Sequence, residues 1–184
     1  MNRVNTAPLT VLALLVATLL AVPMLTQAPA DSASFEAGNQ VLISSHDRFK
    51  IQEKLLYAYA YTYDSKDCVS WSNLFTTDAV LDLRSSGKLI GRDAILQFCI
   101  TRQKNVVRNI KTRHNMMNIV FDQLSPRRAE TRTYFILTWQ KPGDQIPAIQ
   151  AAGTYRDVIV KSDDGRWLFK ERKAIDASWA SGSL

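Results

Sequence analysis

The chain has 184 residues, a formal net charge of +6 and 46% hydrophobic residues, with only two histidines and two cysteines. This length fits one domain and a short extension. The densest basic stretch, residues 102–113, has no interleaved aromatic side chain on which a base could stack. We therefore interpret that stretch as a solvated helix end and loop, and expect no nucleic-acid partner.

The N-terminal segment has the pattern of an export signal. Arg3 is the only charge before residue 31, residues 7–25 are mostly apolar, and Ala28-Pro29-Ala30 is a small-x-small pattern. The alternative is an uncleaved anchor, since the apolar stretch approaches the roughly 20 residues that cross a bilayer. Pro23 and the lack of a following basic cluster favour cleavage. We expect residues 1–30 to be a signal peptide and the mature protein to be periplasmic or secreted, with membrane contact only if the segment is retained.

Helices are expected in the first half of the mature chain, after a flexible lead-in over residues 31–44. A helix capped by Ser44 or Ser45 carries apolar residues at helical spacing through Tyr63. Asp67 can cap a short second helix, and a third begins at Gly91. Between them, residues 79–83 and 88–90 flank a Ser-Ser-Gly turn and predict a hairpin.

Four long strands are expected in the second half. They are residues 112–124, 129–139, 149–160 and 167–175, separated by turn sequences rich in Ser, Pro, Gly and Asp. Helices followed by long strands predict an α+β domain over residues 45–178, with residues 179–184 as a tail. We expect a cone-shaped, curved antiparallel sheet that wraps around the N-terminal helices and encloses a pocket.

Strand alternation assigns side chains to the two faces of this sheet. Thr131, Thr133, Phe135, Leu137 and Trp139 should face the cavity, and Arg132, Tyr134 and Ile136 the outside. By the same period, His114, Met116, Asn118 and Val120 share one face of the preceding strand. If that face lines the cavity, an imidazole lies in a largely apolar pocket.

Asp64 is the natural partner for that imidazole. It ends an otherwise apolar helix, where a buried carboxylate would be costly without a partner. If the helix lies inside the curled sheet, Asp64 can accept a hydrogen bond from His114, fix its tautomer and make it a general base. The alternatives are a solvated helix-end Asp64 and a purely structural core His114.

Cys68 and Cys99 leave two interpretations open, a disulfide or two buried thiols. No CxxC, HExxH, P-loop or dinucleotide-binding motif occurs in the sequence. His114, even with Asn115 and Asn118 nearby, makes a poor metal site. We therefore expect neither a metal nor a cofactor.

Several motifs resemble SnoaL-like proteins of the nuclear transport factor 2-like superfamily, over residues 46–176. The stretches 63–67 and 112–114 resemble the helix end and one histidine strand of scytalone dehydratase. Residues 153–157, 164–167, Phe169 and Arg172 look like the last two strands of SnoaL-like proteins. The resemblance implies the fold. It does not specify the activity, because the superfamily contains dehydratases, dehydrochlorinases, isomerases and non-enzymatic binders.

The resemblance also implies roles for individual residues. Tyr63, Asp64 and His114 fall on catalytic positions of the dehydratases, and the Asp–His pair resembles the dyad of the dehydrochlorinase branch. Thr154, Arg156, Trp139, Asn118, Met116 and Phe135 are the expected substrate-binding residues. Leu83 and Trp139 stand where scytalone dehydratase has a tyrosine and a second histidine, which argues against the same substrate.

The expected function is thus a cofactor-independent lyase or isomerase that acts on a small, largely apolar molecule. The alternatives are a non-catalytic small-molecule binder with the same pocket and an interaction module that uses the outer face of the sheet. The resemblance further implies a homo-oligomer, either a dimer or a trimer.

Overall fold

The computed structural model describes residues 45–83 and 86–176. The predicted signal peptide 1–30, the lead-in 31–44 and the tail 179–184 lie outside these residues. Helical residues begin at Ser45 and continue through the elements η1 (Gln52–Leu56) and α2 (Tyr57–Asp64). The remaining elements are, in order, α3 (Cys68–Ser72), β1 (Phe75–Asp82), β2 (Lys88–Ile90), α4 (Arg92–Asn105), β3 (Lys111–Leu124), β4 (Arg128–Gln140), β5 (Ala148–Lys161) and β6 (Trp167–Asp176).

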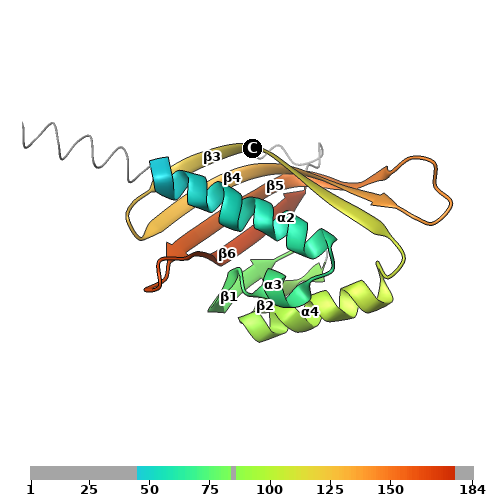
Figure 1. Ribbon diagram of the computed structural model, residues 1–184, viewed down its shortest axis with the longest axis horizontal. Coiled ribbons are helices and arrows are strands. Elements are labelled where there is room, and N and C mark those ends of the chain that lie inside the picture. Colours follow the sequence, from blue (N-terminus) through green and yellow to red (C-terminus); the bar gives the residue numbers. More distant parts are fainter. Residues whose placement is uncertain (1–44, 84–85, 177–184) are drawn as a thin grey trace, which may run out of the picture.

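The strands form one six-stranded curved sheet in the order β2-β1-β6-β5-β4-β3. The long helix that ends with α2 lies across β3 to β6, while α3 and α4 lie at the end that holds β1 and β2 (Figure 1). The α+β class and the sheet curved over N-terminal helices are confirmed. One strand pair departs from the expected antiparallel sheet: β1 and β6 run parallel, because the chain returns to β1 only after the β3–β6 meander.

The first helix contains a π-helical turn, Gln52–Leu56, which the sequence pattern did not predict. A π turn has one residue more than an α turn, so it rotates the apolar face of the helix that follows. Leu55 and Leu56 are both buried beside this turn, and Tyr59 and Tyr63 are buried further along. The turn therefore directs these two tyrosines toward the sheet.

A buried ion pair lies in the core between this helix and the sheet. The guanidinium of Arg172 donates to both carboxylate oxygens of Asp157, each at 2.8 Å, and both side chains are 0% exposed. Thr131 donates a further hydrogen bond to Asp157, at 3.3 Å. The guanidinium carbon of Arg172 also lies 4.1 Å from the ring centroid of Tyr59. Hydrogen bonds and aromatic faces thus replace the water that this charge would otherwise need.

The Cys68–Cys99 disulfide, which the sequence had left open, joins α3 to α4 across 31 positions of the chain. The N-terminus of α3 is capped as expected, because the Asp67 side chain accepts a hydrogen bond from the backbone N–H of Ser70 at 3.0 Å. The two helices are thereby fixed as a unit beside α2. None of the helices in the described part of the chain is long and apolar enough to cross a membrane.

Candidate functional site

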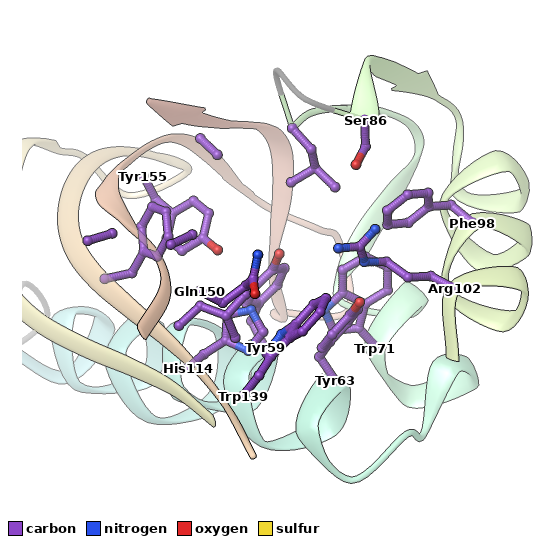
Figure 2. A pocket seen from close by; sticks show the side chains of 16 residues that line it. Tyr59, Tyr63, Trp71, Ser86, Phe98, Arg102, His114, Trp139, Gln150 and Tyr155 are labelled. Carbon is purple, nitrogen blue, oxygen red and sulfur yellow. The ribbon is translucent and has the colours of Figure 1, made fainter. Parts of the chain in front are cut away.

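The sheet and the helices enclose a cavity of about 490 Å³. This volume is in the range of small-molecule sites. Aromatic side chains form much of its wall: Tyr59, Tyr63, Trp71, Phe98, Phe135, Trp139 and Tyr155. The other described lining residues are Leu83, Ser86, Arg102, His114, Leu137, Gln150, Ala151, Ala152 and Ala174 (Figure 2). The cavity is therefore suited to a planar, mainly apolar molecule.

Asp64 and His114 meet at the wall of this cavity, as predicted. The ring nitrogen Nδ1 of His114 lies 2.8 Å from Oδ1 of Asp64, and the backbone N–H of His114 donates to Oδ2, also at 2.8 Å. The hydroxyl of Thr112 donates to Oδ1 at 2.8 Å. The His114 and Asp64 side chains are only 6% and 9% exposed. The last residue of α2 is thus bound to two positions of β3.

The environment of Asp64 keeps its carboxylate ionised. Burial by itself would raise its pKa, but the hydrogen bonds and charge of His114, together with the Thr112 hydroxyl, hold the pKa below its ordinary value. An ionised carboxylate only accepts hydrogen bonds, so Nδ1 of His114 carries the proton that lies between them. In the neutral ring the lone pair then belongs to Nε2, the nitrogen that is left for a ligand in the cavity. The geometry fits a general base, although the roles of both residues stay predictions.

Tyr63 lies beside His114, with the two rings edge to face and their centroids 5.2 Å apart. Burial raises the pKa of Tyr63 to about 12, even though the neighbouring Arg102 lowers it. The phenol therefore stays protonated near neutral pH and serves as a hydrogen-bond donor rather than as a base. As a donor, Tyr63 can position substrate or water, and this role stays a prediction.

The expected register of β4 is confirmed, but Thr131 and Thr133 lie in the core and not in the cavity wall. Thr131, Thr133 and Phe135 are buried, with exposures of 1%, 0% and 4%, whereas Tyr134 is 50% exposed. Phe135, Leu137 and Trp139 continue along the same face into the cavity wall. Two of the expected substrate-binding residues, Phe135 and Trp139, therefore line the cavity.

The expected positions of Thr154 and Arg156 were wrong. In the β4–β5 ladder Thr154 pairs with Tyr134 and Arg156 with Arg132, and directly paired residues point to the same face of a sheet. Tyr134 and Arg132 face outward, so Thr154 and Arg156 do as well. Neither residue lines the cavity, and Arg156 instead borders a groove on the outer face. Alternation places the intervening residue Tyr155 inside.

Asn118 and Met116 are also outside the cavity wall. Asn118 adopts φ 54°, a left-handed conformation that asparagine tolerates better than most residues. The β3–β4 register shifts there by one residue, which is a β-bulge, and alternation inverts beyond it. Asn118 is exposed and Val120 is 45% exposed, while the next residue, Phe121, packs on the core. Met116 faces the core and packs against it without reaching the cavity.

Sequence reasoning missed the contribution of α4. Phe98 and Arg102 both line the cavity. They are one helical turn apart and continue the apolar face of Ile95 and Cys99, so helical periodicity could have placed Arg102 on the inner side. It had been interpreted as part of a solvated basic stretch. Within the described part of the chain, no three His, Cys, Asp or Glu side chains are grouped to hold a metal ion.

The fold is similar to several solved structures. A nuclear transport factor 2-like protein with a cystatin-like fold from Novosphingobium aromaticivorans has a TM-score of 0.67 and 18% identity, over 83% of this chain and 96% of that one. A proposed scytalone dehydratase from the same organism has a TM-score of 0.62 and 23% identity, over 73% and 87%. A Catenulispora acidiphila protein in complex with S-DNPA has a TM-score of 0.63 and 18% identity, over 72% and 94%.

The sequence comparisons agree with the fold. No curated protein matches the chain. The SnoaL-like domain, however, matches residues 44–173, which run from the first helix into β6 and include the described cavity-lining residues except Ala174. The chain therefore belongs to the SnoaL-like domain family.

Proposed function

We propose that this protein is a cofactor-independent lyase or isomerase, with elimination of water as the leading reaction, acting on a small and largely apolar molecule. The observation that carries the proposal is the contact between Asp64 and His114 in the wall of an aromatic cavity. A histidine oriented by a buried carboxylate is a common form of general base near neutral pH. The family supports this at a coarser level, since its members include dehydratases and isomerases.

The chemistry follows from the orientation of the imidazole. Nε2 of His114 takes a proton from a carbon next to a carbonyl group, and Asp64 stabilises the imidazolium that forms. The electron pair of the broken C–H bond becomes a C=C bond as the β-hydroxyl leaves with the electron pair of its C–O bond. The imidazolium returns its proton to that oxygen, so water departs and His114 is regenerated. Tyr63 donates a hydrogen bond to the substrate carbonyl oxygen.

The test uses a small β-hydroxy ketone, 4-hydroxy-4-phenylbutan-2-one, whose loss of water gives an enone with a distinct ultraviolet absorbance. His114→Ala should abolish conversion, and Asp64→Asn should lower kcat by about 10²–10⁴-fold. His46→Ala is the matched control, because this second histidine is exposed near the start of the first helix. Equal rates in His114→Ala and the unmodified protein would overturn the proposal.

A non-catalytic binder is the second candidate, and one observation favours it. Thr154 and Arg156, which were expected to polarise a substrate oxygen, face away from the cavity. A ligand could then be held by the aromatic wall alone. Saturable binding of the ketone without conversion, unaffected by Asp64→Asn, would support this candidate over the enzyme.

Export and self-association complete the proposal. A cleavable leader over residues 1–30 is supported by its sequence, and the Cys68–Cys99 disulfide is typical of proteins in oxidising compartments. A dimer or trimer is supported by apolar side chains on the outer face of the sheet, such as Val120 and Tyr134, which are 45% and 50% exposed. Light scattering of the mature protein would test association, and a monomer at micromolar concentration would contradict it.

A further inference from the structure

Arg102 introduces a positive charge into the aromatic cavity. Its guanidinium projects from α4 between the rings of two lining residues, 5.9 Å from the centroid of Phe98 and 6.0 Å from that of Trp139 (Figure 2). It also forms a hydrogen bond with the hydroxyl of Tyr63. These neighbours position the guanidinium, yet none of them carries a negative charge.

This charge has no counter-ion in the described part of the chain. No aspartate or glutamate is among the described lining residues, and Arg102 forms no ion pair with any described carboxylate. Asp64, the carboxylate just behind the wall, is already engaged by His114 and Thr112. By contrast, the core guanidinium of Arg172 has a bidentate carboxylate partner. Arg102 is therefore the only Arg, Lys, Asp or Glu among the described residues that line the cavity.

A second donor of the same wall also lacks an acceptor. The indole N–H of Trp71 is buried and makes no hydrogen bond with any described residue, and the Trp71 side chain is 0% exposed. A buried donor without a partner is unfavourable, because it loses the hydrogen bond that water provides in the unfolded chain. The guanidinium of Arg102 has five N–H donors, more than the Tyr63 hydroxyl can satisfy. An oxygen-rich, anionic group in the cavity would supply acceptors for the guanidinium.

We propose that the natural ligand of this cavity is an aromatic carboxylate, whose ring packs on the aromatic wall and whose carboxylate binds Arg102. The inference rests on the proposed use of the cavity as a ligand site and narrows its ligand to an acid. A bidentate pair between guanidinium and carboxylate, placed beside aromatic rings in a sheltered cavity, is stronger than the same pair in water. The charge also fixes which end of the ligand points toward α4.

The test compares two probes of the same shape, 2-naphthoate and the neutral 2-naphthamide, at pH 7.5. Quenching of Trp71 and Trp139 fluorescence reports binding, with calorimetry as the independent measurement. The unmodified protein should bind 2-naphthoate roughly 10- to 100-fold more tightly than 2-naphthamide, and Arg102→Gln should remove most of this preference while leaving amide affinity within about threefold. Lys104→Gln is the matched control, because it removes the same charge from an exposed position of α4.

The possible outcomes separate this inference from the proposed reaction, because neither probe can lose water. A preference for naphthoate that is lost in Arg102→Gln and kept in Lys104→Gln supports the proposal that the ligand is an aromatic carboxylate bound by Arg102. Equal binding of both probes by the unmodified protein would refute an aromatic carboxylate as the ligand. An equal loss of the naphthoate preference in both variants would refute it as well. Either result leaves the general-base proposal standing. Binding of neither probe contradicts a ligand cavity of this shape and therefore both proposals.

Discussion

His114 forms hydrogen bonds with both carboxylate oxygens of Asp64, one through its ring nitrogen Nδ1 and the other through its backbone N–H, each at 2.8 Å. The backbone bond fixes the position of Asp64 relative to β3, and the ring bond fixes the rotation of the imidazole. The same carboxylate therefore docks the helix on the sheet and orients the candidate base. Stability and chemistry are coupled at this residue, and the experiments must separate them.

The tautomer of His114 provides a direct test that needs no substrate. Its neutral ring should carry the proton on Nδ1, because that nitrogen faces an ionised carboxylate. Nitrogen-15 NMR of the imidazoles reports the tautomer, and only two histidines contribute signals. Asp64→Asn should weaken the preference, whereas Thr112→Val should keep it. A neutral ring with its proton on Nε2 in the unmodified protein would contradict the proposed orientation.

The lowered pKa of Asp64 predicts a specific pH dependence of stability. Because its folded-state pKa lies below the ordinary value, Asp64 stabilises the fold fully above that ordinary value, and this contribution disappears as the pH falls through the folded-state pKa. The difference in unfolding free energy between the unmodified protein and Asp64→Asn should therefore be constant near neutrality and shrink below about pH 4. Urea denaturation from pH 7 to pH 2.5 measures it. A difference that grew on acidification would refute the pKa direction.

The buried pair of Arg172 and Asp157 should be far more important for stability than an exposed pair of the same sheet. Asp157→Asn leaves a buried guanidinium without its counter-charge and should cost about 3–5 kcal/mol. Asp122→Asn, which breaks the half-exposed pair with Arg132, should cost far less, because water and salt screen an exposed pair. Chemical denaturation of both variants gives the comparison. Similar costs would mean that Arg172 reaches water or another partner when Asp157 is neutralised.

The Cys68–Cys99 disulfide should stabilise the protein and preserve the helical wall of the cavity. Closing a loop of about 30 residues is worth roughly 3–4 kcal/mol in the chain-entropy model. The double variant Cys68→Ala/Cys99→Ala should unfold at lower temperature and bind 2-naphthoate more weakly, because α3 and α4 carry Trp71 and Arg102. Thiol labelling under denaturing conditions checks that the bond exists. Quantitative labelling of both cysteines in unreduced protein would show that it does not.

Export predicts that the mature chain begins near Asp31. Ala28 and Ala30 supply the small side chains that signal peptidase accepts. Intact-mass measurement of protein recovered from the native host distinguishes a cleaved signal peptide from an uncleaved membrane anchor. A full-length mass in a membrane fraction would support the anchor instead.

Local pattern predicted most of the fold, since each helix and long strand has its own periodicity and turn residues. Alternation also gave the correct faces of β4, because that strand has no irregularity between Thr131 and Leu137. It failed where the backbone departs from regular geometry. The bulge at Asn118 inverts the faces of β3, and nothing in the local sequence marks it strongly.

The candidate site was predictable only in part. The dyad could be anticipated because an acidic residue at the end of an apolar helix needs a partner, and His114 was the only histidine on a strand. Arg156 was misplaced because the resemblance to the family does not reveal the strand register, which pairs Arg156 with Arg132 on the outer face. The importance of Arg102 depends on what surrounds it in space. The neighbours of Arg102 include Tyr63 and Trp139, which are distant in the sequence. The spacing of residues within α4 does not reveal these neighbours.

The π turn of residues 52–56 makes the cavity sensitive to the length of its helix as well as to its composition. Removing one residue from that turn would give a regular α-helix in which Tyr59 and Tyr63 keep their phase with the segment before the turn, because the π turn holds one extra residue. Inserting one residue between the turn and Tyr59 would instead rotate Tyr59 and Tyr63 by about 100°, away from the cavity wall. A scan of point substitutions keeps the residue count and would leave this dependence unseen. Ligand recognition by this helix should therefore tolerate a one-residue deletion in the turn better than a one-residue insertion beside it.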